Sequence, residues 1–385
     1  MKIVIAPDSF KESLDALAVA NCIETGFKEI FPDAEYVTLP LADGGEGTVD
    51  VLLQGLLGEK QFTQVTNPVG QPVTAMWAML EASNINEKKT ALIEVAAASG
   101  LDLLLSEQRN PLVTSTFGTG ELILEALNQG AEKILIGLGG SATNDGGAGI
   151  LQALGAKLLD CNGNEVEKGG LALSNLSSID FSELDPRCQY TEMVVACDVN
   201  NPLCGTTGAS HIFGRQKGAS DSDVLALDSA LVKFAYIAER TQHVNHQYSA
   251  GFGAAGGIPM GLSLAFNINL QAGIDMILDV LNADQILHHA DLVITGEGQM
   301  DNQTLQGKTP YGIAKRAAKQ GIPTLAIAGS LGSEVEALYG DIYSVFGTVR
   351  SPQTLEQVLQ EAEKNLTRTA RNIAATLLLG KNIIR

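Results

Sequence analysis

The chain has little positive charge and no long apolar run. Of its 385 residues, 25 are Lys or Arg and 44 are Asp or Glu, which gives a net charge of −19. Nucleic acids and anionic membranes bind proteins through basic surfaces, so we expect neither as a partner. No apolar stretch reaches the length of a membrane span, and Asp8, Lys11 and Glu12 interrupt the N-terminus before a secretory segment could form. We therefore expect a cytoplasmic protein.

Cysteine and histidine motifs are also scarce. The five cysteines are odd in number and form no C-x-x-C pattern, so we expect reduced structural thiols rather than disulfides or a zinc site. Hydrophobic residues make up 45% of the chain and charged residues 18%, which is ordinary for a globular protein with an ample core. At this length, two domains are expected rather than one.

Residues 133–149 read K-I-L-I-G-L-G-G-S-A-T-N-D-G-G-A-G. The apolar run 134–138 predicts a buried parallel strand, and a glycine-rich loop follows it. Glycine N–H groups that lead into a helix expected from residue 148 would form an anion site suited to phosphate. Glycine-rich turns also occur where nothing binds, so both interpretations stay open. The loop adds polar side chains from Ser141, Thr143, Asn144 and Asp145, of which the carboxylate could hold magnesium or its waters.

The same loop also fits the dinucleotide fingerprint G-x-G-x-x-A through Gly137, Gly139 and Ala142. Asp160 lies near the distance in sequence that is expected for a ribose contact. Residues 156–166, however, are more typical of a hairpin around Asn162-Gly163 than of the second strand of a βαβ unit. An NAD(P)-dependent oxidoreductase is therefore the alternative from a different class, ranked behind nucleotide-phosphate binding.

Both ends of the chain show an alternation of strand and helix, whereas the middle does not. Residues 61–80 predict an antiparallel hairpin, and residues 91–98 predict another strand. The two ends are consistent with one sheet. We therefore expect an α/β protein with a discontinuous Rossmann-like three-layer domain, residues 1–57 and 285–385. A mixed α/β domain, residues 58–284, is inserted, and the site lies in the interdomain cleft.

The two terminal parts of the chain are expected to contain five strands and a long final helix. A final amphipathic helix is expected after Ser351-Pro352, with a single apolar stripe from Leu355 to Leu377. The expected strands of the terminal domain are residues 2–6, 35–39, 291–295, 324–328 and 341–346.

Carboxylates follow three of these strands, at Asp8, in the turn 43–46 and in the loop 297–301. The exits of parallel strands lie on one edge of a sheet, so residues that are distant in sequence converge there. Lys11 and Lys308 add positive charge. Phosphoryl transfer needs this mixture: carboxylates that hold a divalent cation, and a cationic side chain that spreads the transferred charge. A Walker A loop is excluded, because the loop that ends at Lys308 has Asn at position 302 where the first glycine belongs.

Several segments together resemble the bacterial type I glycerate kinases, in order and over nearly the whole chain. The resemblance implies ATP- and Mg²⁺-dependent phosphorylation of D-glycerate to 2-phosphoglycerate by a protein of two α/β domains. Three residues depart from the family pattern: Glu12 replaces the usual Gly, Arg215 the usual Pro, and Gln299 a common Arg. The segments that carry the resemblance are 6–14, 41–48, 137–149, 198–205, 213–219, 295–298 and 307–308.

The resemblance and the residues together suggest roles for individual side chains. The expected nucleotide contacts are Gly139, Gly140, Ser141, Thr143, Glu297 and Lys308. The expected magnesium ligands are Asp43 and Asp145. Asp8, Lys11 and Lys217 are expected around glycerate and the transferred phosphoryl group. Asp198 is the expected catalytic base; the alternative is that it caps its own loop through Asn200.

Besides the oxidoreductase, two further functional alternatives stay open at this point. A glycerate 3-kinase or another small hydroxy-acid kinase would use the same residue types, because the sequence gives no distances to either hydroxyl of glycerate. A nucleotide-binding protein without enzymatic activity is disfavoured, since it has no need for so many carboxylates at strand exits. The sequence leaves the oligomeric state open.

Overall fold

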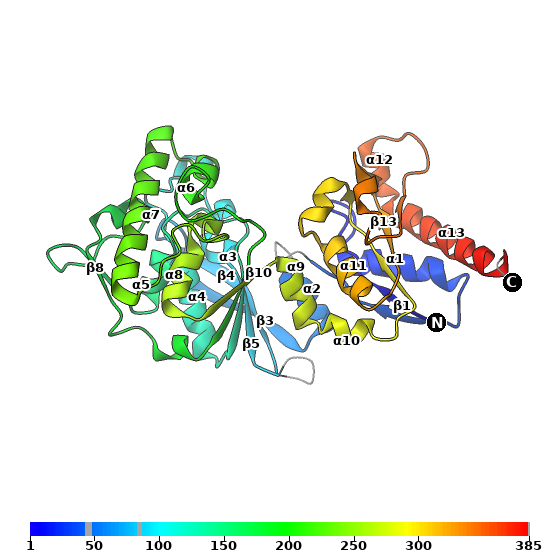
Figure 1. Ribbon diagram of the computed structural model, residues 1–385, viewed down its shortest axis with the longest axis horizontal. Helices are drawn as coiled ribbons and strands as arrows, with labels where there is room; N and C mark the ends of the chain where they lie inside the picture. Colours follow the sequence, from blue (N-terminus) through cyan, green and yellow to red (C-terminus); the bar gives the residue numbers. More distant parts are fainter. Residues whose placement is uncertain (43–47, 83–86, 384–385) are drawn as a thin grey trace. The chain divides into compact units, whose positions relative to one another are not determined.

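The computed structural model describes residues 1–42, 48–82 and 87–383. Its contacts divide it into two compact units (Figure 1). The terminal unit comprises Met1–Asp43, Asp50–Leu56 and Ile274–Arg385, and the central unit comprises Gly44–Val49 and Leu57–Gly273. Both contain helices and parallel strands, which confirms the α/β class. The expected domain boundaries stay a prediction, because compactness does not test which segments fold independently.

The terminal unit is built on a five-stranded sheet in which all pairings are parallel. The chain starts at a central strand, adds a neighbour on one side and then returns to the other side. The order therefore reverses between β1 and β11, and this is the switch point at which open α/β sheets bind ligands. The strands, in spatial order, are β15 (Ser344–Gly347), β13 (Thr324–Ala328), β11 (Leu292–Thr295), β1 (Lys2–Ile5) and β2 (Glu35–Thr38).

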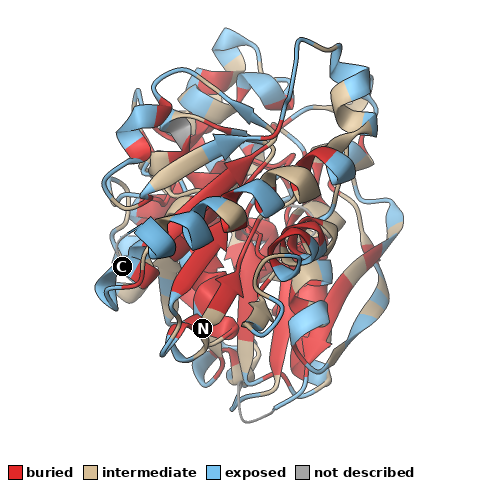
Figure 2. Ribbon diagram, turned by 90° about the vertical axis from the view of Figure 1, so that its right-hand side faces the viewer, coloured by how far each residue is buried: buried red, intermediate tan, exposed pale blue. Residues whose placement is uncertain are grey.

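Helices cover both faces of this sheet. Side chains alternate along each strand, so Ile327 packs with α1 (Ala16–Lys28) and α13 (Ala362–Ile383), whereas Ala326 packs with α11 (Thr309–Lys319). Figure 2 shows the result: the strands are mostly buried, and the helices expose their outer faces. Burial on both faces explains why the strands are apolar runs without alternation in the sequence.

The C-terminal helix differs from the expected one. It is divided into α12 (Leu355–Gln360) and α13, and the N-cap is Thr354, whose side chain accepts from the N–H of Gln357 in a capping box. The expected apolar stripe is wrong at its ends, since Leu355 is 69% exposed and Leu377 is 40% exposed. The middle of the stripe packs on the sheet through Leu366 and Ile373, and the helix is divided at Glu361.

The loop after β1 contains a strained residue. Glu12 has a φ of 64°, a left-handed conformation that costs an ordinary residue about 1–2 kcal/mol and glycine very little. This backbone conformation gives a physical reason for the glycine that the glycerate kinases usually have at this position.

The central unit contains a six-stranded mixed sheet. Its first four strands are parallel, and the last two are antiparallel. The predicted hairpin is confirmed, with its turn at residues 67–70 and Gly70 at a φ of 82°. In spatial order the strands are β10 (Ile268–Gln271), β9 (Glu192–Ala196), β6 (Lys133–Gly137), β5 (Thr90–Glu94), β4 (Pro72–Leu80) and β3 (Gly58–Thr66).

Helices and short strands complete the two units. β5 ends at Glu94 and not at the expected residue 98, because α3 (Ala96–Ser99) begins two residues after Glu94. A single core that includes Trp77 joins the sheet to its main helices, α4 (Phe117–Asn128), α5 (Ala148–Ala153), α7 (Asp221–Gln242) and α8 (Ile258–Ala265). The other short elements are α2 (Thr48–Gly55), α6 (Ala209–Phe213), α9 (Gly273–Val280), α10 (Ala283–Leu287), β12 (Gln299–Met300) and β14 (Ser330–Leu331).

The dinucleotide interpretation is wrong in the structure. β7 (Lys157–Leu159) pairs antiparallel with β8 (Ser178–Asp180) in a separate two-stranded sheet, so the segment directly after α5 is not the second strand of a βαβ unit; the parallel neighbour of β6 is β9, much later in the chain. Asp160 instead accepts from the N–H groups of Asn162 (2.8 Å) and Asn164 (2.9 Å) and holds the turn. The turn at Asn162-Gly163 is as predicted, with Gly163 at a φ of 82°.

Candidate functional site

A pocket of about 340 Å³ lies where the strands of the terminal sheet end. Asp8 follows β1 and Glu297 follows β11, so the two carboxylates flank the switch point. Lys11 and Lys308 also line this pocket. The structure thus brings together four of the expected site residues, which are separated by almost three hundred positions in the sequence.

Both oxygens of the Asp8 carboxylate accept a hydrogen bond. Oδ1 accepts from the N–H of Ser9 at 2.6 Å, and Oδ2 accepts from the hydroxyl of Thr309 at 2.7 Å. Thr309 is fully buried at the start of α11. Sequence reasoning missed Thr309; its position directly before Pro310, at the beginning of a helix, was the available signal.

Glu297 is buried and has two polar neighbours. Its Oε1 accepts from the hydroxyl of Thr304 at 2.7 Å, and its Oε2 lies 3.6 Å from the Nζ of Lys308. Burial raises the pKa of Glu297, and the negative charge of Asp8 acts in the same direction, whereas Thr304 and Lys308 oppose the shift. A cation in the pocket would therefore be stabilised by two carboxylates.

Gln299 also lines this pocket, at the position where the family often has Arg. Its Nε2 donates to Oδ2 of Asp301 at 3.2 Å. A neutral amide adds no positive charge, so among the described lining residues the cationic side chains are Lys11, which is exposed, and Lys308.

The glycine loop of the central unit connects β6 to α5, but it does not present its N–H groups as expected. The N–H groups of Gly147 and Gly149 donate to the carboxylate of Asp145, and that of Gly146 donates to the carbonyl of Gly256. The expected anion site at the start of this helix is therefore wrong: these donors already have partners, and α5 is only six residues long.

Close packing explains the glycine at position 256, in a segment that packs against this loop. A Cβ on Gly256, which has a φ of 74°, would lie 2.1 Å from the carbonyl oxygen of Thr143. Gly139 and Gly140 differ, because both are exposed, and a Cβ on Gly139 would meet nothing within 4 Å. The open part of the loop, where a ligand can approach the backbone, is thus its first turn.

Asp145 is fully buried. Its Oδ2 accepts from the backbone N–H of Thr116 (2.8 Å) and from the Thr116 hydroxyl (2.9 Å). Burial raises the pKa of Asp145, while the hydrogen bonds from Thr116, Gly147 and Gly149 act in the opposite direction. These contacts fix the shape of the loop, so they support a structural role and give no support to the expected magnesium ligand.

The other expected magnesium ligand, Asp43, lies outside the described residues. Within the described part of the chain, no group of three or more His, Cys, Asp or Glu side chains could hold a metal ion. All five cysteines are free, as expected, and Cys161 is exposed.

Lys217 is buried beneath the glycine loop. Its Nζ donates to the Ser141 hydroxyl at 2.9 Å and to the carbonyl of Thr143 at 2.7 Å. Burial lowers the pKa of Lys217 to about 7, although the charge of Asp145 opposes the shift. Three of the expected site residues, Ser141, Thr143 and Lys217, therefore form one cluster.

Two polar atoms of the same loop are buried without a hydrogen-bond partner in the described structure. They are Oγ1 of Thr143 and Oδ1 of Asn144. Most buried polar atoms in folded proteins have a partner, so such atoms mark a place where a polar ligand or water would complete the structure.

Asp198 is exposed after β9, the strand next to β6. The register that pairs Ala196 with Gly137 places Asp198 at the same edge of the sheet as Gly139. Its Oδ1 accepts from the N–H of Gly273 at 3.0 Å, the first residue of α9. Asp198 therefore supports the start of a helix, and its expected role as a base stays a prediction.

Carboxylates and lysines at the switch point of a parallel sheet define the chain as an α/β protein with a polar ligand site at that edge. It belongs to the glycerate kinase family, whose model matches residues 3–378.

The chain is 50% identical to glycerate 2-kinase from Escherichia coli (strain K12) over 381 residues, with 99% of each chain covered. It is 48% identical to a glycerate kinase from Bacillus subtilis (strain 168) over 384 residues, with 100% of this chain and 99% of the relative covered. A solved structure from Salmonella typhimurium LT2, described as a glycerate kinase 2, is 49% identical and superposes with a TM-score of 0.88, with 99% of each chain covered.

Proposed function

We propose that the chain transfers the γ-phosphoryl group of ATP to the C2 hydroxyl of D-glycerate, which yields ADP and 2-phosphoglycerate. The observation that carries the proposal is the pocket in which Asp8, Glu297, Lys11 and Lys308 converge. The name of the Escherichia coli relative, glycerate 2-kinase, supports transfer to C2 rather than C3.

Phosphoryl transfer depends mainly on positioning and on charge stabilisation. We assign Lys11 to the transferred phosphoryl group, and Glu297 and Lys308 to the nucleotide site. In the central unit, we assign the open turn at Gly139 and Gly140, together with Ser141 and Thr143, to nucleotide phosphate. The pocket carboxylates and the loop N–H groups have different roles in this proposal.

Magnesium is implied by the family, and its fit can be judged from the pocket. Asp8 and Glu297 line the same space, and the charge of Asp8 contributes to the raised pKa of Glu297. A divalent cation there would offset that repulsion. Mg²⁺ is usually held by one or two carboxylates together with substrate phosphates, so this pair suffices without an all-protein cage. When bound, Mg²⁺ would neutralise charge on the phosphate oxygens.

The regiochemistry is tested with a coupled assay. We expect the purified protein with D-glycerate and Mg-ATP to drive NADH oxidation through enolase, pyruvate kinase and lactate dehydrogenase, without phosphoglycerate mutase. Only a 2-phospho product can enter enolase directly. A signal that appears solely after mutase is added would mean transfer to C3. No signal with D-glycerate, but ATP turnover with another short hydroxy acid, would change the substrate.

Asp198 is proposed as the general base. Asp198→Asn should lower kcat by about 10²-fold or more with little change in the KM for ATP, because general-base contributions are typically 10²–10⁴-fold. Asn keeps an oxygen that can accept from the Gly273 N–H, so the start of α9 should stay protected from hydrogen exchange. Turnover like that of the wild type would assign the base to another carboxylate, with Asp8 the first candidate.

A further inference from the structure

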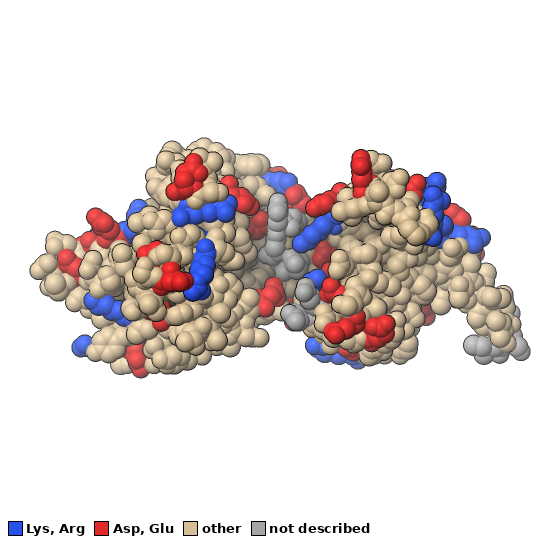
Figure 3. Space-filling model, turned by 90° about the horizontal axis from the view of Figure 1, so that it is seen from above, with Lys and Arg blue, Asp and Glu red and all other residues tan. Residues whose placement is uncertain are grey.

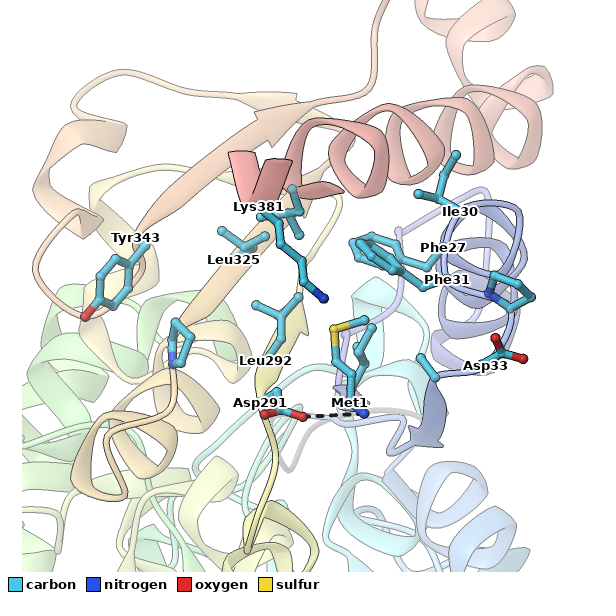
Figure 4. Close-up of a pocket in the computed structure, with 15 residues that line it drawn as sticks. Met1, Phe27, Ile30, Phe31, Asp33, Asp291, Leu292, Leu325, Tyr343 and Lys381 are labelled. Carbon is cyan, nitrogen blue, oxygen red and sulfur yellow. Dashed lines mark ion pairs between the residues drawn. The ribbon is translucent and has the colours of Figure 1, made fainter. Parts of the chain in front are cut away.

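The terminal unit has a second pocket, of about 620 Å³, at the edge of the sheet opposite to the candidate site (Figure 4). Its lining includes residues that immediately precede or begin the parallel strands. They are Met1 before β1, Ala34 before β2, Leu292 in β11, Pro323 before β13 and Tyr343 before β15. The strands run from this pocket toward the residues of the candidate site, so a ligand bound here is not the substrate.

The floor and walls of this pocket are apolar. Phe27, in the last turn of α1, and Phe31, just after this helix, contribute aromatic rings. Leu292 and Leu325 contribute side chains from the sheet (Figure 4). Leu377 of α13 borders the same space. Small-molecule sites typically measure about 300–1,000 Å³ and are lined mostly by apolar side chains, so this pocket has the size and lining of one.

Two ammonium groups border this apolar space: the N-terminus of Met1, which lies 3.9 Å from Oδ2 of Asp291, and Lys381. Lys381, in the last turn of α13, extends past Leu325, and its ammonium group lies between Phe31 and Leu292 (Figure 4). Within the described part of the chain, the salt bridges do not include Lys381. A lysine that covers apolar surface normally directs its charge to water. Lys381 is exposed as well, and its ammonium group lies over the pocket.

The carboxylates of the pocket do not neutralise Lys381. Oδ2 of Asp291 accepts from the backbone N–H of Lys2 at 2.7 Å. The carboxylate of Asp33 lies at the far side and points away from the centre of the pocket (Figure 4). The centre of the pocket is therefore apolar, and its border carries two ammonium groups: that of Met1, which pairs with Asp291, and that of Lys381.

We propose that this pocket binds an amphipathic monoanion, namely an aliphatic carboxylate of medium chain length. Its carboxylate group pairs with the ammonium of Lys381, and its chain packs against Phe27, Phe31, Leu292 and Leu325. The charge-assisted contact fixes one end of the ligand, and burial of methylene groups provides most of the affinity.

Isothermal titration of the full chain with decanoate tests this proposal. We expect one saturable site, with octanoate weaker and each added methylene tightening the Kd by up to roughly fourfold. Saturating D-glycerate should leave the affinity unchanged, because the candidate site is at the opposite edge of the sheet. Hydrogen exchange should show protection by decanoate in residues 27–34, at the end of α1.

Charge reversal supplies the decisive comparison. Lys381→Glu should weaken decanoate binding by tenfold or more and should favour decylammonium instead. Lys364→Glu is the matched control, because Lys364 is exposed on the same helix, does not line the pocket and gives the same change in net charge. Its Kd for decanoate should change less than twofold.

Three outcomes would overturn the proposal. Equal effects of the two charge reversals would show that Lys381 makes no contact with the ligand. Equal binding of decanoate and decylammonium to the wild type would remove the anion preference. Uptake of several equivalents without saturation would mean adsorption of a surfactant rather than occupation of a pocket. Thermal unfolding of each variant in the absence of ligand separates any of these from a failure to fold.

Discussion

At the residue scale, the most informative side chain is Lys217, since its pKa is lowered to about 7 by burial. The unfolded chain binds this proton up to the ordinary lysine pKa, about 10.4, whereas the folded protein releases it near pH 7. Between these values the unfolded state holds more protons, so stability rises with pH in that window. Below pH 7 both states are protonated, and the full cost of burying the ammonium is present.

This linkage gives a prediction for Lys217→Met. The free energy of unfolding of the wild type, relative to the variant, should increase by up to about 1.4 kcal/mol per pH unit between about pH 7 and pH 10. Urea unfolding at a series of pH values measures the difference. Lys364→Met, at an exposed position, should give a flat difference over the same range. If the difference in unfolding free energy between the wild type and Lys217→Met is also independent of pH, the charge of Asp145 keeps Lys217 protonated over this range.

Residue types were easier to predict than residue contacts. The sequence identified Asp8 and Glu297 because carboxylates at strand exits are visible in a pattern. It did not identify Thr309 and Thr304, whose hydroxyls hold these carboxylates from positions that only the folded chain brings close. The same limitation explains Asp145: the sequence shows a carboxylate in a glycine loop, but not that the nearby N–H groups already occupy its oxygens.

At the element scale, the glycine loop and the segment around Gly256 that packs against it contain two kinds of glycine that a sequence cannot distinguish. Gly256→Ala should cost roughly 3 kcal/mol of stability, since it adds left-handed strain and a Cβ 2.1 Å from the Thr143 carbonyl. Gly139→Ala should leave stability within about 0.5 kcal/mol, because its Cβ would meet nothing within 4 Å. The KM for ATP should nevertheless rise about tenfold in Gly139→Ala, as the methyl group blocks close approach of phosphate.

Urea unfolding and steady-state kinetics on these two variants measure both effects. An unchanged KM for ATP in Gly139→Ala would show that the first turn of the loop does not contact the nucleotide. An unchanged stability in Gly256→Ala would show that the loop can move away from residues 256–261.

The regular elements were predictable where the pattern was local. Parallel strands such as β11 and β13 appear as short apolar runs between polar turns, and the β3–β4 hairpin is indicated by its Asn-Pro-Val-Gly turn. The division of the last helix was not predictable from its stripe. Serine is by itself at least as good an N-cap as threonine, so the choice of Thr354 over Ser351 depends on which side chain reaches the N–H of Gln357.

At the scale of the whole molecule, the chain carries a net charge of −19. On the face that Figure 3 draws, acidic and basic side chains are interspersed, with no continuous basic area among the described residues. This surface is consistent with the expectation that nucleic acid is not a partner. None of the helices in the described ranges combines the length and the apolarity needed to cross a membrane.

The organisation into two units leads to the last prediction. The chain passes from the terminal to the central unit after Leu56 and returns after Gly273, and Asp198 holds the first residue of the returning helix. Connections of this kind commonly act as hinges, and a kinase gains from closure, because excluding water prevents hydrolysis of ATP while the acceptor is absent. We therefore expect the radius of gyration from small-angle scattering to fall when D-glycerate and a non-hydrolysable ATP analogue with Mg²⁺ are both bound. Either ligand alone, as the control, should produce a smaller change. Superimposable scattering curves for the free protein and the ternary complex would contradict closure, and protection of ATP from water would then have to come from local loops.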